Sequence, residues 1–100
     1  MEYNILADGK DYSVAMQGQF VFSDNQQFRS IMELLEKDAQ SLTLNLQALS
    51  FVDSAALGML LLLRDRAHQK GAQLALLQPQ GQVKKLFALS RFEDLFNIIE

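Results

Sequence analysis

Alternating apolar and polar residues at the start of the chain predict a β-hairpin. Residues 3–7 and 12–16 both follow the period-two pattern of half-buried strands. Between them lies Asp8-Gly9-Lys10-Asp11, whose Asp-Gly step favours a tight turn. The two strands are therefore expected to pair with each other.

The next segment has the spacing of an amphipathic helix. Phe28, Ile31, Met32 and Leu35 recur every three or four residues, which predicts a helix over residues 25–37. Before that pattern begins, Asp24 has a side chain suited to capping the helix, and Gln27 stands three residues later, where it could return the bond.

The rest of the chain alternates strands and helices. Leu42, Leu44 and Leu46 predict a third strand, and an apolar helix follows over residues 55–70, with Lys70 and Gly71 as its end. Residues 74–77 predict a fourth strand, which Pro79 stops, and residues 83–89 mark a third helix. Residues 96–99 fit either a last short strand or an extension of that helix.

This order predicts an α/β fold in one domain covering residues 1–100. Strands that are joined through helices run parallel where they pair, whereas the hairpin is antiparallel, so the sheet is mixed and the helices pack on it. With 49% hydrophobic and 21% charged residues, a chain of 100 residues can bury one core.

Composition and charge narrow the functional classes. The formal net charge is −3 and no basic stripe is present, so no nucleic-acid partner is expected. The longest apolar run, residues 55–63, is nine residues, whereas a membrane span needs about 20. We therefore expect no membrane insertion, and because residues 1–8 lack the pattern of a signal peptide, a cytoplasmic location.

Residues suited to catalysis are few. The chain has one histidine, His68, no cysteine, no glycine-rich phosphate loop and no cluster with metal-ligand spacing. We therefore expect no catalytic residue, no metal site and no cofactor, and His68 is interpreted as a surface residue.

One short segment stands out, because it delivers Asp53 and Ser54 to the start of the apolar helix. The first backbone N–H groups of a helix lack partners there, and the helix dipole favours negative charge. The simplest interpretation is that one of the two residues is an N-cap. Since one residue suffices for a cap, a serine hydroxyl is left beside a carboxylate. A phosphate on it would gain from the helix N-terminus, would be repelled by Asp53, and would place about −2 of charge next to an apolar surface.

At this point the chain resembles a known family. The segment FVDSAALGMLLLL, with the strand LTLNLQALS before it and VKKLFALSRFEDLFNII after it, is similar to the STAS domain of bacterial anti-sigma factor antagonists. The resemblance covers nearly the whole chain and implies a STAS-type mixed sheet with helices packed mainly on one side. It also implies that Ser54 is phosphorylated and that Asp53 supports it.

The sequence departs from the family pattern at two places. Ala55 and Ala56 stand where a second hydroxyl residue and a glycine are usual, so Ser54 is the one acceptor at this turn. After Gly18, Gln19 and Val21 replace the two acidic residues that many antagonists carry in that loop.

The resemblance implies a function in partner switching. The unphosphorylated protein would bind an anti-sigma factor that is also a serine kinase, and phosphorylation of Ser54 would release it; a cognate phosphatase would reset the switch. The alternative is a STAS accessory subunit that docks on the ATPase of a membrane lipid transporter of the ABC type, in which Ser54 is mainly a cap. A small enzyme or nucleotide-binding protein is the least favoured class.

The face of the apolar helix that meets the partner is left open by the sequence. If the helix buries Ala56, Leu60, Leu63 and Ala67, then Leu57 and Leu61 lie outward; if it buries Leu57, Leu60 and Leu61, then Gly58, Met59 and Leu62 do. The expected partner-binding residues therefore include members of both sets: Ala55, Leu57, Gly58, Met59, Leu61 and Leu62.

Overall fold

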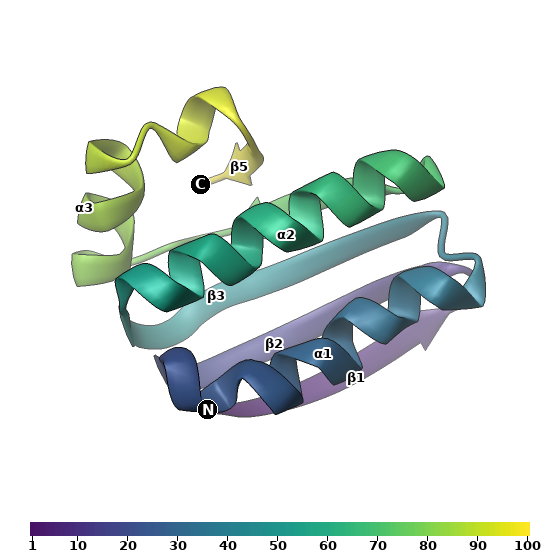
Figure 1. Ribbon diagram of the computed structural model, residues 1–100, viewed down its shortest axis with the longest axis horizontal. Helices are drawn as coiled ribbons and strands as arrows, with labels where there is room; N and C mark the ends of the chain where they lie inside the picture. Colours follow the sequence, from purple (N-terminus) through teal and green to yellow (C-terminus); the bar gives the residue numbers. More distant parts are fainter.

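A five-stranded mixed sheet carries two helices on one of its faces in the computed structural model, which describes residues 1–100 (Figure 1). The elements, in chain order, are β1 (Glu2–Asp8), β2 (Asp11–Phe20), the 3₁₀ turn η1 (Phe22–Asp24), α1 (Asn25–Met32), the 3₁₀ turn η2 (Glu33–Lys37), β3 (Ser41–Val52), α2 (Ser54–Lys70), β4 (Gln73–Leu77), α3 (Gly81–Leu89), the 3₁₀ turn η3 (Phe92–Asp94) and β5 (Asn97–Ile99). The predicted fold class, a mixed sheet with helices mainly on one side, is confirmed.

Strand order in the sheet follows chain order, from β1 to β5. β1 and β2 form the predicted antiparallel hairpin, and the Gly9 backbone supplies the positive φ of 64° that its turn requires. β2, β3, β4 and β5 pair in parallel. The carboxyl ends of the inner strands therefore lie at one edge of the sheet, where α1, α2 and α3 are entered.

β2 and β3 are longer than the sequence pattern predicted, and they are paired irregularly. The partner of Ala15 is Asn45, but the partner of Gln17 is Ala48, and a second shift follows after Gly18. β3 thus carries an extra residue twice. These bulges explain its burial pattern, which changes from every second residue, up to Leu46, to every third, at Leu49 and Val52.

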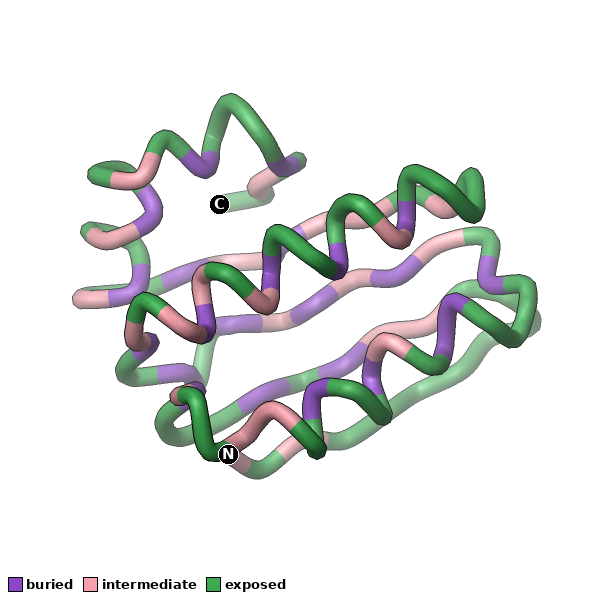
Figure 2. Tube along the Cα trace, viewed as in Figure 1, coloured by how far each residue is buried: buried purple, intermediate pink, exposed green.

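The core lies between the sheet and the helical layer (Figure 2). β3 contributes five buried side chains to it: Leu42, Leu44, Leu46, Leu49 and Val52. Phe20 stacks on Phe28 at 4.8 Å between ring centroids, which fastens the end of β2 to α1.

The first helix differs from its prediction in two respects. It is α-helical only to Met32 and continues as 3₁₀ turns to Lys37. The predicted capping of this helix by Asp24 and Gln27 is wrong, because Asp24 makes no cap bond to α1. Its Oδ2 instead accepts a hydrogen bond from the Val21 N–H at 2.8 Å, which closes the preceding turn η1.

The two remaining alternatives are settled by the structure. α2 buries Ala56, Leu60, Leu63 and Ala67, which is the first of the two predicted phasings. Residues 97–99 form a strand, β5, and do not extend the third helix.

Candidate functional site

The candidate site lies where β2 and β3 end and where η1, α2 and α3 begin. The Asp53 N–H donates to the Phe20 carbonyl at 3.3 Å, which joins the ends of the two strands. On the other side, the Val52 N–H donates to Oε1 of Gln82 on α3, also at 3.3 Å. The start of α2 is therefore held between η1 and the first turn of α3 (Figure 1).

Asp53 is the N-cap of α2 and uses both carboxylate oxygens. Oδ1 accepts from the Ala56 N–H at 2.8 Å, which satisfies one of the free donors at the helix start. Oδ2 accepts from the Phe22 N–H at 3.1 Å, across the gap to η1. One side chain thus caps the helix and fixes the neighbouring turn against it.

Ser54 is the first residue of α2, and it is exposed. Asp53 already performs the capping, so the Ser54 hydroxyl is not needed for it, and no hydrogen bond within the chain engages this hydroxyl. Of the two predicted roles at this turn, the cap belongs to Asp53, and the serine oxygen is free to react or to bind.

Phe22 adds an aromatic ring to this corner that the sequence analysis did not identify. Its backbone is hydrogen-bonded to Asp53, while its side chain is 67% exposed. No local sequence signal places it there, because its neighbour at the site lies 31 residues later in the chain. The backbone of this exposed phenylalanine is thus bonded to the residue that precedes the exposed Ser54.

The expected partner-binding residues of α2 fall into two groups. Gly58, Leu61 and Leu62 are exposed, and the exposed fraction of Leu62 reaches 59%. Ala55, Leu57 and Met59 are half-buried along the sides of the helix. The apolar start of α2 therefore exceeds what its buried face requires, as the sequence indicated.

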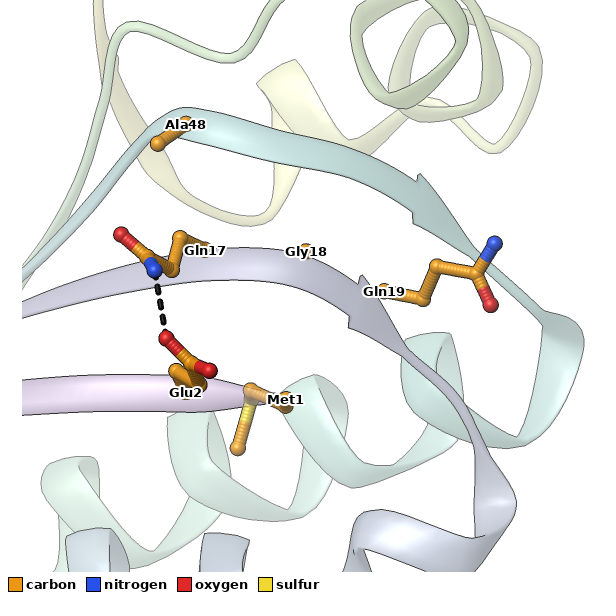
Figure 3. Close-up of a pocket in the computed structure, with 6 residues that line it drawn as sticks. All are labelled: Met1, Glu2, Gln17, Gly18, Gln19 and Ala48. Carbon is orange, nitrogen blue, oxygen red and sulfur yellow. Dashed lines mark hydrogen bonds between the residues drawn. The ribbon is translucent and has the colours of Figure 1, made fainter.

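A hollow of about 490 Å³ lies on the sheet and is lined by Met1, Glu2, Gln17, Gly18, Gln19 and Ala48, without Ser54 (Figure 3). Its polar groups are partly used already, since Gln17 Nε2 donates to Glu2 at 2.6 Å and the Gly18 carbonyl accepts from the Ser50 hydroxyl at 3.0 Å.

The ammonium group of Met1 forms a partly buried ion pair with Asp24 of η1 at 3.1 Å, whereas the ion pairs of Glu36 and Asp38 lie on the surface. Lys70 and Arg66 on α2 hydrogen-bond to Glu36 and hold the pKa of that carboxyl below its ordinary value. Lys10 binds Asp38 at 2.8 Å, which lowers the pKa of the carboxyl and raises that of the amine.

The structure contains no group of three or more His, Cys, Asp or Glu side chains that could hold a metal ion. No helix has both the length and the apolarity needed to span a membrane.

Sequence comparison agrees with this architecture. Residues 5–100 match the family model of the STAS domain. A STAS-domain containing protein of Pseudomonas aeruginosa is 40% identical over 92 residues, which are 92% of this chain and 91% of that protein.

Solved structures share the fold at low sequence identity. An anti-sigma factor antagonist from Mycobacterium paratuberculosis superimposes with a TM-score of 0.86 at 11% identity, covering 98% of this chain and 84% of its own. The phosphorylated form of SpoIIAA, a Bacillus cell fate determinant, gives a TM-score of 0.76 at 18% identity, covering 99% and 92%. At these identities the likeness concerns the fold.

Proposed function

The chain belongs to the STAS domain family, and from this premise we propose that it is an anti-sigma factor antagonist switched by phosphorylation of Ser54. Unphosphorylated, it binds an anti-sigma factor that is also a serine kinase, and the phosphorylated form is released until a phosphatase restores the hydroxyl. The protein itself is a cytoplasmic regulator without catalytic activity.

One observation carries this proposal: Asp53 caps α2, and the Ser54 hydroxyl makes no hydrogen bond within the chain. Because Asp53 alone caps α2, phosphorylation of Ser54 removes no bond that holds the fold. In the transfer, the Ser54 oxygen attacks the γ-phosphorus of ATP, the bond to the bridging oxygen breaks, ADP leaves, and the hydroxyl proton passes to a base of the kinase.

The phosphate would act on binding through its charge. It brings about −2 to a corner whose nearest carboxylate, Asp53, is already occupied by two backbone N–H groups. A partner that covers Phe22 and the start of α2 would have to bury this charge, and burial of a charge costs much free energy unless the partner pairs it.

The test compares Ser54→Ala with Ser54→Asp as baits in native cytosol, followed by phosphorylation of the wild type with the captured kinase and ATP. We expect the alanine variant to retain the kinase, the aspartate variant to lose it, and mass spectrometry to find phosphate on Ser54 alone. Phosphate on Ser54→Ala, or none on the wild type, would contradict the proposal. Equal capture of a transporter ATPase by both variants would favour the alternative function as an accessory subunit.

A further inference from the structure

Gly58 occupies an exposed position of α2, one turn after Ser54. Its backbone is helical, and a Cβ atom added to it would meet no atom of the chain within 4 Å. Glycine destabilises a helix relative to alanine, because it loses more conformational freedom on folding. Nothing within the chain therefore accounts for a glycine here.

Two exposed leucines follow Gly58 on the same side of the helix. Leu61 is 36% exposed and Leu62 59% exposed, and both lie opposite the buried residues of α2. Together with Ser54 and Gly58 they form what we call the α2 ridge. Gly58 lies between Ser54 and the two leucines, and because it has no side chain it leaves a notch in this ridge.

Beside the ridge, a hollow of about 330 Å³ separates α2 from α1 and is lined by Arg29, Met32, Glu33, Glu36, Leu62 and Arg66. Glu36 is neutralised by Arg66 and Lys70. Arg29 has no ion-pair partner in the chain, and the only carboxylate in this lining that is also unpaired is Glu33.

The helical layer is positively charged although the chain is acidic. α1, η2 and α2 contain five basic residues, Arg29, Lys37, Arg64, Arg66 and Lys70, and three acidic ones, Glu33, Glu36 and Asp65. The net charge of the whole chain is −3. A partner segment that lies on this layer is therefore complementary if it is acidic.

From this geometry we infer that an acidic amphipathic helix of the partner crosses the α2 ridge at Gly58. The absent Cβ lets the two helix backbones approach closely, the apolar face of the partner helix covers Leu61 and Leu62, and its carboxylates face Arg29. This inference rests on the proposed function, since the partner is the kinase that modifies Ser54.

A partner helix at Gly58 also explains how a phosphate on Ser54 would weaken binding. Ser54 lies four residues before Gly58, about 6 Å along the helix axis. A dianion at that distance is within one Debye length of an acidic helix and repels it. The same partner helix would approach the unmodified serine without this repulsion.

The experiment uses the full chain and the purified kinase that phosphorylates Ser54, with dissociation constants measured by calorimetry. Gly58→Gln, which keeps a good helix former, is expected to weaken binding about 10- to 100-fold, because a side chain fills the contact. Arg29→Glu is expected to weaken binding about 10-fold at low salt and less at high salt. Lys85→Glu, an equal change of charge on α3, is the matched control and should bind as the wild type.

A photo-crosslinking residue in place of Leu62 identifies the contacted segment. We expect the crosslink to fall in an acidic helix of the kinase, and a crosslink to a basic segment or a loop would overturn the inference. Wild-type affinity of Gly58→Gln together with loss of binding by Ser54→Asp would refute the crossing helix and leave the proposed function intact. Wild-type affinity of Ser54→Asp, or absence of any Ser54 kinase, would refute both.

Discussion

At the level of single residues, Asp53 connects the stability of the protein to the geometry of its switch. Its Oδ1 caps α2 through the Ala56 N–H, and its Oδ2 holds η1 through the Phe22 N–H. The first bond stabilises the helix, while the second fixes the backbone of Phe22, whose side chain is exposed, to the residue that precedes Ser54. A substitution that keeps one of these bonds and removes the other therefore tests the two roles of Asp53 separately.

Asp53→Ala removes both bonds and is expected to lower the free energy of unfolding by about 1–2 kcal/mol, the usual cost of losing an N-cap. Asp53→Asn retains a carbonyl oxygen that can accept from Ala56, and asparagine is as good an N-cap as aspartate. We expect Asp53→Asn to lose much less stability than Asp53→Ala in urea denaturation. Equal stability of Asp53→Ala and the wild type would show that this cap does not contribute.

Phe22 is expected to contribute to partner binding but not to folding. Phe22→Ser should change the free energy of unfolding by less than about 0.5 kcal/mol, because the side chain is 67% exposed, yet weaken the complex with the Ser54 kinase at least tenfold. Leu6→Ser is the matched control, since Leu6 is 71% exposed but lies on β1, opposite Ser13. If both variants bind equally well, Phe22 is not part of the interface.

The sequence predicted Asp53 and Ser54 correctly as a pair at a helix start, because capping is a local property of a few neighbouring residues. It did not predict which of them caps, and it did not predict Phe22 at the site. That contact depends on a hydrogen bond between residues 31 positions apart, which exists only once β2 and β3 are paired.

At the level of elements, the glycine within α2 and the glycine that caps its end have different conformational requirements. Gly71 ends the helix with a φ of 70°, a left-handed conformation that side chains rarely adopt, whereas Gly58 has helical geometry and open space around it. Gly71→Ala is expected to lower the free energy of unfolding by about 1 kcal/mol or more. Gly58→Ala is expected to raise it by about 0.5–1 kcal/mol.

Thermal or urea denaturation of the two variants measures this contrast directly. If Gly58→Ala destabilises the free protein, then the glycine serves the fold after all, and the interpretation of position 58 as a contact point for a partner loses its basis.

β3 shows where an element could have been predicted better. The period-two pattern up to Leu46 was recognised, but Leu46, Leu49 and Val52 are three residues apart, and this spacing is a sign of bulges that keep one face buried. Helices and strands with regular patterns can be predicted from local sequence. The position of the bulges also depends on the pairing of β3 with β2, although the three-residue spacing of the buried side chains is present in the sequence.

At the level of the whole molecule, ion pairs tie parts of the fold that are distant in sequence. Glu36 of η2 contacts Arg66 and Lys70 of α2, and Lys10 of the hairpin turn contacts Asp38. These partners are about 30 residues apart and have no common sequence pattern, so the sequence alone could not predict them. All of them are exposed, and each contributes modestly and is weakened by salt.

These pairs determine how stability responds to acid. The pKa of Glu36 is lowered from its ordinary value of 4.5 by hydrogen bonds from Lys70 and Arg66, and the pKa of Asp38 is lowered from 3.8 by Lys10. A carboxyl with a lowered folded-state pKa stabilises the protein above its unfolded pKa, and this contribution is lost as pH falls through the folded value. We therefore expect stability to decrease below about pH 4.5.

Glu36→Gln tests this expectation, because glutamine retains the size of the side chain but cannot titrate. The variant should be slightly less stable than the wild type at pH 7, and its free energy of unfolding should fall less steeply between pH 4.5 and the acid transition, measured by urea denaturation at low ionic strength. Glu93→Gln is the control, since Glu93 is exposed and forms no ion pair. Parallel pH profiles for Glu36→Gln and the wild type would show that the contact between η2 and α2 does not couple protonation to folding.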